Sequence, residues 1–228
     1  MRNECRSGDK SWLRPVTRRR ALVALSCLAL LTGGGPVRAA TGLSEPAQQW
    51  VGAFTNDGLA LLRDRTASTE QQVARFRQLL DTYFAIDAIG RWVLGRYWRQ
   101  ATEQERQDYL ALFEDFVVYG YVQRFSEYSG ETIRIVNAAD NADGSATVNS
   151  LVERRNSDQP IRVDWRVSRS DDGAMRLTDV VIENVSLSQT YRADFAATLQ
   201  QQGGDISGLL AVLRQRVAAQ KAQLGIRP

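Results

Sequence analysis

The sequence contains no histidine, and its two cysteines, Cys5 and Cys27, both lie close to the N-terminus. Without an imidazole, the chain lacks the general base of Ser–His and Cys–His catalysis and a principal ligand of ordinary zinc sites. It also lacks a Walker A motif, a GxSxG motif and a dinucleotide-binding fingerprint. The sequence therefore predicts no catalytic residue, no metal ion and no cofactor.

An apolar run of transmembrane length is missing from the N-terminal region. Ala21–Leu31 is apolar but far shorter than the ~20 residues that a spanning helix needs. It follows the basic stretch Arg14–Arg20 and precedes the small-residue site Val37-Arg38-Ala39. This order is typical of a secretory signal peptide, so we expect a leader over residues 1–39 and a mature chain over residues 40–228.

Details of the export signal leave more than one route open. Thr17–Leu22 approximates a twin-arginine signal, although Ala21 stands where that signal favours phenylalanine, so both the twin-arginine and the general secretory routes fit. A lipid anchor on Cys27 is a weaker alternative because Leu25-Ser26 matches a lipobox poorly. We expect an exported, cleaved protein in the periplasm.

Removing the leader reverses the net charge. Residues 1–39 hold eight of the 29 Lys and Arg residues and two of the 26 Asp and Glu residues, so residues 40–228 keep 21 basic and 24 acidic side chains, a net charge of −3. Nucleic-acid affinity depends largely on neutralising phosphates with basic residues. No nucleic-acid partner is therefore predicted. Both cysteines belong to the leader, so the mature chain has no disulfide, and its length allows a buried core without one.

The first half of the mature chain is predicted to be helical because apolar residues recur at three- and four-residue spacing. Helices are expected from Ser44, with Gly58 as a possible interruption, from Ser68 or Thr69, and over Ile86–Leu94. Thr102 and Glu105 form a capping box at the start of the fourth helix. That helix is expected to reach about Tyr128, with one apolar face formed by Tyr109, Phe113, Phe116, Val117, Tyr121 and Phe125.

The period of the pattern then changes to that of strands. Strands are predicted at Glu131–Ala138, Ser145–Arg155, Pro160–Arg169 and Met175–Val185, joined by short turn sequences that imply an antiparallel meander. In the third, Ile161, Val163, Trp165 and Val167 alternate with Arg162, Asp164 and Arg166; the last carries Val180, Val181, Ile182 and Val185 on both faces. Helices near Ser188–Gln202 and Asp205–Leu224 follow. We predict a single α+β domain, a four- to five-stranded curved antiparallel sheet with helices packed over one face.

Several stretches resemble the MlaC family, which comprises periplasmic phospholipid-binding proteins also called toluene-tolerance auxiliary components. They are Phe76–Tyr83, Ile89–Thr102 (IGRWVLGRYWRQAT), Tyr121–Tyr128, Asp179–Phe195 and Gly203–Leu210. The resemblance covers nearly all of the mature chain, in the same order. Met175 departs from it, because the family usually has tryptophan before the strand that contains Asp179.

The resemblance implies an NTF2-like cone that holds acyl chains between the sheet and the long helix. It implies a periplasmic lipid-transport role in outer-membrane lipid asymmetry: a phospholipid ligand is shuttled between an outer-membrane lipoprotein–porin complex and the inner-membrane Mla ABC transporter complex, with its headgroup largely left to solvent. Independently, an exported domain rich in apolar faces suits a lipid carrier, because each buried methylene contributes about 0.8 kcal/mol.

Candidate lipid-binding residues lie on both the helices and the strands. They are Trp92, Trp98, Phe113, Val117, Tyr121, Val163, Trp165, Val181, Val185 and Tyr191. Packing into an ordinary core is the alternative for each, above all for the two tryptophans. Arg96 and Arg99 are candidates for a headgroup rim at the cavity mouth, and a solvated surface is their alternative role. Arg192 is a further candidate at the entrance.

Three other functions compete with the phospholipid carrier. An NTF2-like isomerase or cyclase would use Asp164 or Asp179 as its carboxylate and Tyr109 or Tyr121 as its donor, although Asp164 alternates away from the apolar strand face. An exported interaction module would have its cone filled by its own side chains. A hopanoid carrier of the same family would keep the transport role with a rigid polycyclic ligand.

Overall fold

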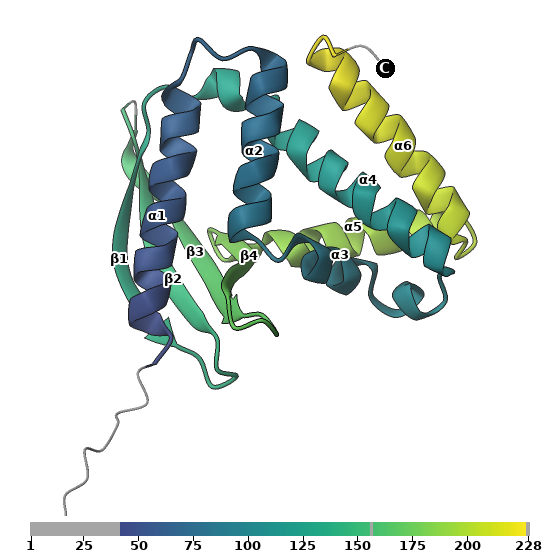
Figure 1. Ribbon diagram of the computed structural model, residues 1–228, viewed down its shortest axis with the longest axis horizontal. Coiled ribbons are helices and arrows are strands. Elements are labelled where there is room, and N and C mark those ends of the chain that lie inside the picture. The colour runs from purple at the N-terminus through teal and green to yellow at the C-terminus, as the bar shows by residue number, and fades with distance from the viewer. Residues whose placement is uncertain (1–41, 156, 227–228) are drawn as a thin grey trace, which may run out of the picture. The chain divides into compact units, whose positions relative to one another are not determined.

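The computed structural model describes residues 42–155 and 157–226 (Figure 1). The chain divides into Met1–Ala39 and Ala40–Pro228, and the account below concerns the second unit. The predicted leader lies outside the described residues, so the signal peptide stays a prediction.

Helices occupy the first half of the described chain and its C-terminal end. Their bounds are α1 Ser44–Arg63, α2 Thr69–Tyr83, α3 Ile86–Leu94, α4 Glu103–Val122, α5 Leu187–Gln201 and α6 Ile206–Gln223, with short 3₁₀ helices η1 Gly95–Arg99 and η2 Phe125–Glu127. The predicted starts of α2 and α4 are confirmed. Ser68 and Gln71 form a capping box at α2, and Thr102 and Glu105 form one at α4. Helix α1 runs through Gly58 without a break.

Helix α4 ends at Val122, six residues before the predicted end at Tyr128. Beyond it the chain tightens, because the Arg124 N–H donates to the Tyr121 carbonyl at 2.9 Å and the 3₁₀ turn η2 follows. Phe125 then packs edge-on against Phe76, with ring centroids 5.3 Å apart. The apolar spacing that predicted a longer helix therefore continues over a tight turn. At ~1.5 Å per residue, α4 spans about 30 Å.

A five-stranded sheet follows the helices. The strands are β1 Thr132–Asp140, β2 Ala146–Arg154, β3 Ser157–Arg169, β4 Met175–Ile182 and β5 Val185–Ser186, in the order β1-β2-β3-β4-β5. Every neighbouring pair is antiparallel. The predicted meander and the α+β class are confirmed, with β5 as a short fifth strand.

The strand register shifts at three places, one of them near the end of β2, between Val152 and Arg154. In β1, Val136 is the extra residue between Ile135 and Asn137. In β4, Thr178 is the extra residue, because Asp179 pairs with Arg166 while Leu177 pairs with Val167.

The bulge in β4 decides which of the following residues face the helices. Val180 pairs with Trp165 and Ile182 pairs with Val163, whereas Val181 pairs with Asp164 on the opposite face. Val181, a predicted lipid-binding residue, therefore lies on the face opposite Val180 and Ile182, because the extra residue at Thr178 shifts the alternation.

The turn between β4 and β5 is built for close strand pairing. Glu183 and Asn184 both have positive φ, at 48° and 66°, as in the two-residue hairpin turns that match strand twist. Val185 then pairs with Ile182, and Ser186 caps the first turn of α5 by accepting a hydrogen bond from the Gln189 N–H. The chain thus passes from the sheet edge directly into a helix.

The buried apolar side chains form two clusters. One joins α1 to the sheet and contains Leu43, Ala47, Val51, Tyr83, Ala146, Val148, Val163, Trp165, Val167 and Leu177, with Met175 packed against it. The other lies among the helices from α2 through α6 and includes Val93, Tyr109, Phe113, Val118, Phe195, Leu199, Leu209 and Leu213. Figure 1 shows α1 lying across the face of the sheet, whereas α4 and α6 run beside each other away from it. Phe84 packs against both clusters.

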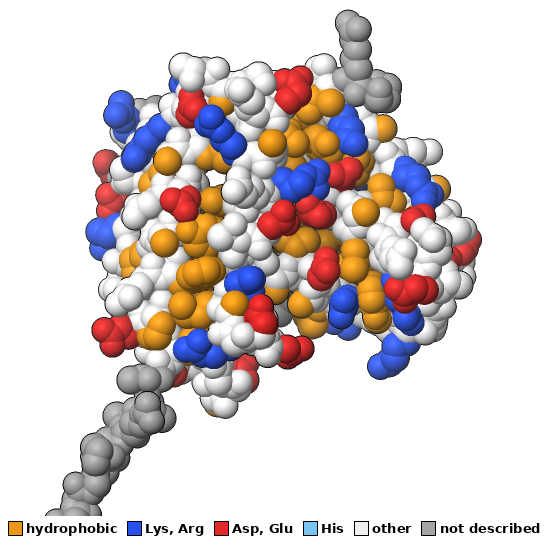
Figure 2. Space-filling model, in the orientation of Figure 1, with side chains coloured by type: hydrophobic (Ala, Val, Ile, Leu, Met, Phe, Trp, Pro, Cys, Tyr) orange, Lys and Arg blue, Asp and Glu red, His pale blue; other side chains and the backbone are white. Residues whose placement is uncertain are grey.

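Charged side chains of both signs are interspersed on the face shown in Figure 2, and neither sign forms a continuous stripe there. This face offers no basic track of the kind that binds a nucleic-acid backbone. Among the helices in the described residues, none has both the length and the apolar character needed to cross a membrane.

Candidate functional site

An apolar cavity of about 280 Å³ lies where the two hydrophobic clusters meet. The sheet contributes Ile133, Val152, Val163, Trp165, Val180 and Ile182, and the helices with their adjoining loops contribute Phe54, Phe76, Leu80, Phe84, Ile86, Ile89, Phe113, Val117 and Leu187. Ligand cavities are typically lined in this way, by apolar side chains with a few polar groups. Side chains from α1 to α5 and from β1 to β4 thus surround one space.

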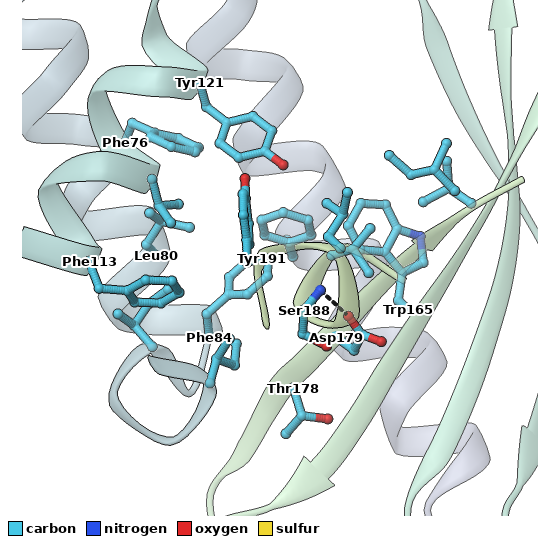
Figure 3. Close-up of a pocket in the computed structure, with 18 of the residues that line it drawn as sticks. Phe76, Leu80, Phe84, Phe113, Tyr121, Trp165, Thr178, Asp179, Ser188 and Tyr191 are labelled. Atoms are coloured by element: carbon cyan, nitrogen blue, oxygen red, sulfur yellow. Dashed lines mark hydrogen bonds between the residues drawn. The ribbon is translucent and has the colours of Figure 1, made fainter. Parts of the chain in front are cut away.

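The polar groups of the wall lie at separate places (Figure 3). Tyr121 and Tyr191 bring their hydroxyls toward each other, while Thr178, Asp179 and Ser188 lie farther along the wall in this view. The remaining wall is almost wholly apolar.

Trp165 presents its ring to the cavity without burying an unsatisfied donor there. Its Nε1–H donates to the Ser150 Oγ at 2.9 Å, and the Ser150 hydroxyl donates to the Val163 carbonyl at 2.8 Å. Phe54 packs edge-on against the indole, with centroids 5.2 Å apart. The polar atom of this side chain is therefore satisfied inside the sheet, which leaves apolar surface for a ligand.

Phe113, which lines the cavity, is held in place by close packing of α3 against α4. Phe113 stacks on Tyr109 at 5.9 Å, and the Tyr109 hydroxyl donates to the Gly90 carbonyl at 3.0 Å. A Cβ at Gly90 would come within 3.0 Å of Leu110 and of Phe113, so glycine lets α3 approach α4. Burial raises the pKa of Tyr109 far above its usual range, and its hydroxyl stays protonated.

Asp179 is a buried carboxylate that anchors α5. The Ser186 hydroxyl donates to its Oδ2 at 2.6 Å, and the Ser188 N–H donates to its Oδ1 at 3.1 Å. The N-terminus of α5 also favours a negative charge at this place. Both oxygens are engaged by the helix start, which gives no support to a role as a free catalytic base.

Asp164, the other carboxylate considered for an enzyme, lies outside the cavity. It is bound by the Arg162 guanidinium at 2.8 Å and by the Asn149 amide at 2.7 Å, on the opposite face of the sheet. Neither carboxylate candidate of the isomerase hypothesis therefore has the position and the free oxygens that such a reaction needs.

The structure brings six of the ten predicted lipid-binding residues together in the cavity wall. They are Phe113, Val117, Tyr121, Val163, Trp165 and Tyr191. Their contact with a ligand stays a prediction. Trp92, Trp98, Val181 and Val185 are not among the residues of the wall.

Trp92 and Trp98 are placed elsewhere by contacts with arginine. Trp92 is 43% exposed and lies under the Arg192 guanidinium, which is 4.6 Å from the ring centroid and donates to the Trp92 carbonyl at 3.1 Å. Trp98 lies between Arg91 and Arg106, each 5.3 Å from its ring. Within the same stretch, Ile89 reaches the cavity.

The two arginines predicted to form a headgroup rim also lie away from the cavity wall. Arg96 and Arg99 belong to η1, are exposed and do not line the cavity. Arg96 lies 4.9 Å from the Tyr97 ring, and Tyr97 packs in the helical cluster. Arg192 caps α3 instead of lining the entrance. Val185 is 57% exposed at the start of β5, and its partner Ile182 lines the cavity.

Several residues of the cavity wall were not predicted from the sequence as ligand contacts. Phe54, Phe76 and Leu80 lie at apolar helix positions, but helical periodicity does not show whether an apolar side chain contacts another side chain or lines a cavity. Val180 and Ile182 required knowledge of the bulge at Thr178, which only the pairing with β3 reveals.

Together, the sheet, the helical layer and the enclosed space define an α+β domain with an apolar ligand cavity. The sequence model of the family described as MlaC protein matches residues 53–215, and the chain belongs to this family. A solved structure described as a phospholipid-binding protein from Ralstonia solanacearum in complex with a phospholipid is similar, with a TM-score of 0.66. It is 24% identical, over 76% of this chain and 98% of the other, which establishes a shared fold.

Proposed function

We propose that this protein is a lipid carrier that binds phospholipid by enclosing its acyl chains in the cavity. The observation that carries the proposal is the apolar cavity between the two hydrophobic clusters. Membership of the MlaC family and the fold shared with the phospholipid-bound Ralstonia protein support it.

The energetics favour acyl chains as the ligand. Each methylene moved from water into an apolar site contributes about 0.8 kcal/mol, so a long chain repays the ordering of the complex. The partly buried wall residues Phe76, Phe84 and Ile89 keep apolar surface that a ligand would cover. Asp179 and Ser188 already satisfy each other, so an apolar ligand leaves no new buried polar group beside them.

We further propose that the carrier works in the periplasm. There it would take lipid from or deliver it to an outer-membrane lipoprotein–porin complex and the inner-membrane Mla ABC transporter complex. The predicted leader and the family membership support this location and these partners. This role requires a cavity that covers the acyl chains, because an exposed acyl chain is unfavourable in the aqueous space between the two membranes.

Native mass spectrometry of protein purified from its own periplasm tests the ligand. We expect a protein–ligand complex whose mass difference matches a two-chain phospholipid. A hopanoid mass would keep the carrier role with a different cargo. Protein that carries no lipid and takes up none from phospholipid vesicles would refute lipid carriage.

Transfer between the two membrane complexes needs a separate assay. Each complex is reconstituted in its own vesicle population, with labelled phospholipid in one, and label movement is measured with and without the protein. We expect the protein to accelerate transfer only when both complexes are present. Equal acceleration with protein-free vesicles would contradict the specific partners.

A further inference from the structure

The Tyr121 and Tyr191 hydroxyls form a polar pair in the wall of an otherwise apolar cavity. Tyr121 is on α4 and Tyr191 is on α5, and their hydroxyls point toward each other (Figure 3). The Tyr191 ring packs against Phe116 at 5.8 Å, and the Tyr121 ring packs against Phe76 at 6.2 Å. Because both rings are held in this way, the positions of the hydroxyls are set before a ligand binds.

This pair lies toward the end of the cavity at which the wall residue Ile182 is partly exposed. Ile133, Val152 and Ile182 line the cavity at one end of the sheet, where β1 begins and β2 and β4 end. Ile182 is 36% exposed there. Tyr121 is one residue from the end of α4, and the chain enters β1 soon afterwards through η2, so the C-terminal end of α4 lies at this end of the sheet (Figure 1).

Two exposed side chains of opposite charge follow the two tyrosines along the chain. Arg124 follows Tyr121 by one 3₁₀ turn, and Asp194 follows Tyr191 by about one turn of α5. Burial raises the pKa of Tyr191 well above its usual range, the neighbouring Tyr121 and Asp194 act in the same direction, and the positive charge of Arg124 opposes them. Among the described residues, neither Arg124 nor Asp194 has an ion-pair partner within 4 Å.

An apolar cavity with a polar pair toward its exposed end matches the layout of a glycerophospholipid. Its ester groups lie between the chains and the phosphate, and burying an ester oxygen without a donor is unfavourable. The C-terminal end of α4 presents carbonyl groups, which repel an anion. An anionic phosphate here therefore needs side-chain donors, and an exposed arginine is well suited to that contact.

We propose that Tyr121 and Tyr191 donate hydrogen bonds to the ester oxygens of a glycerophospholipid, that Arg124 binds its phosphate, and that Asp194 favours a headgroup that carries an ammonium. This inference rests on the proposed lipid-binding function and assigns a headgroup class to it. It moves the charged rim from Arg96 and Arg99 to residues beside the cavity wall.

The ester contact is tested with delipidated protein and a pair of probes, diester and diether phosphatidylethanolamine of equal chain length. The two differ in the ester carbonyls, so their binding ratio in native mass spectrometry reports on the hydroxyl contact. We expect the wild type to prefer the diester by about 3- to 10-fold, the range for one or two hydrogen bonds. Tyr121→Phe, Tyr191→Phe and the double variant should lower this preference toward one. A diester preference that is absent, or is unchanged in all three variants, overturns the ester contact.

The charge contacts are tested by opposite shifts in headgroup preference. Arg124→Gln should reduce binding of phosphatidylglycerol relative to diacylglycerol by about 3- to 10-fold, because a partly exposed charge-assisted contact is lost. Asp194→Asn should raise binding of phosphatidylglycerol relative to phosphatidylethanolamine. Arg96→Gln, which removes an exposed arginine outside the cavity wall, is the matched control and should change neither ratio.

The outcomes separate this inference from the function on which it rests. If the wild type binds none of these lipids, the carrier function fails. If it binds them and Arg124→Gln and Asp194→Asn behave like Arg96→Gln, the carrier function stands and the headgroup assignment is overturned. A melting curve of each variant verifies folding, and the single phenylalanine variants retain the test if the double variant unfolds.

Discussion

Val117 and Val118 are neighbours in α4 that have different surroundings. Val117 is 8% exposed and lines the cavity, whereas Val118 is fully buried in the helical cluster and does not line it. One residue along a helix turns the side chain by about 100°, which is enough to separate a ligand space from a packed core.

Val117→Trp should therefore reduce lipid occupancy while leaving a folded protein, because the added ring enters the cavity. Val118→Trp, the matched control, should destabilise the protein by about 1–3 kcal/mol or more through overpacking. Thermal unfolding of the delipidated variants and native mass spectrometry measure the two effects. Equal destabilisation by both substitutions would show that the space beside Val117 is closed to an added ring.

The exposed arginines of η1 allow a test of long-range charge. Replacing Arg96 and Arg99 together with glutamate should leave lipid content near normal, because neither lines the cavity. Transfer to an anionic membrane complex should slow at low salt and recover as salt is raised, since screening shortens electrostatic attraction. Transfer rates measured across a salt series check this. Complete loss of bound lipid would contradict the placement of these residues outside the site.

At the scale of elements, α1 and α2 are joined by a hydrogen bond beside the sheet cluster. The Tyr83 hydroxyl donates to the Asp57 Oδ2 at 2.6 Å, and the Tyr83 ring packs edge-on against Phe54. The hydrogen bond to Asp57 is the main cause that raises the pKa of Tyr83 to about 12. The protonated phenol is thus favoured in the folded state, relative to an unfolded pKa of about 10.

The sign of this shift predicts an alkaline stability loss. The contribution of Tyr83 is fully present below pH ~10 and is lost as pH rises toward 12, because the unfolded state releases its proton first. Tyr83→Phe should cost about 1–2 kcal/mol near pH 8, and its difference from wild type should shrink toward pH 12. Urea unfolding at several pH values measures it. A difference that stays constant with pH would mean that the phenol proton does not contribute.

Local signals predicted some element features and missed others for a physical reason. The caps at Ser68 and Thr102 were readable because both partners of each box are within four residues. The end of α4 was missed because Phe125 continues the apolar spacing although the chain has turned. The bulge at Thr178 was missed because it is defined by pairing with β3, which no short window contains.

At the scale of the whole molecule, the cavity lies between the two hydrophobic clusters, which do not pack fully against each other there. Apolar periodicity predicted one face of α4 and one face of β3, which supply Tyr109, Phe113 and Val117 to one cluster and Val163, Trp165 and Val167 to the other. It did not reveal that α1 belongs with the sheet while α2 to α6 form their own core, because that depends on how helices pack over long distances. The family resemblance therefore gave the choice of ligand and the expected position between the sheet and the long helix, and the structure gave the side chains that line the cavity.

A ligand between two clusters should stabilise the whole fold. Delipidation should lower the melting temperature, because a ligand that binds only the folded state adds about 2.7 kcal/mol at one hundred times its dissociation constant. Adding phospholipid back should restore it. Differential scanning calorimetry of the native, stripped and refilled protein measures the change. If the stripped protein has an unchanged melting temperature and takes up no lipid, a ligand does not contribute to the stability of the fold.

The bulge at Val136 has a consequence for solubility. Strand β1 pairs with β2 on one side and has no strand partner on its outer side among the described residues, so its backbone groups there are open to pairing with a second chain. Natural proteins discourage such edge-to-edge aggregation with bulges and charges, and β1 has both, in the bulge at the half-exposed Val136 and in the Arg134–Glu153 ion pair. Deleting Val136 would give β1 an even register and a straighter edge. We expect the variant to self-associate at concentrations at which the wild type is monodisperse by analytical ultracentrifugation. If it stays monodisperse, the edge is protected by other means.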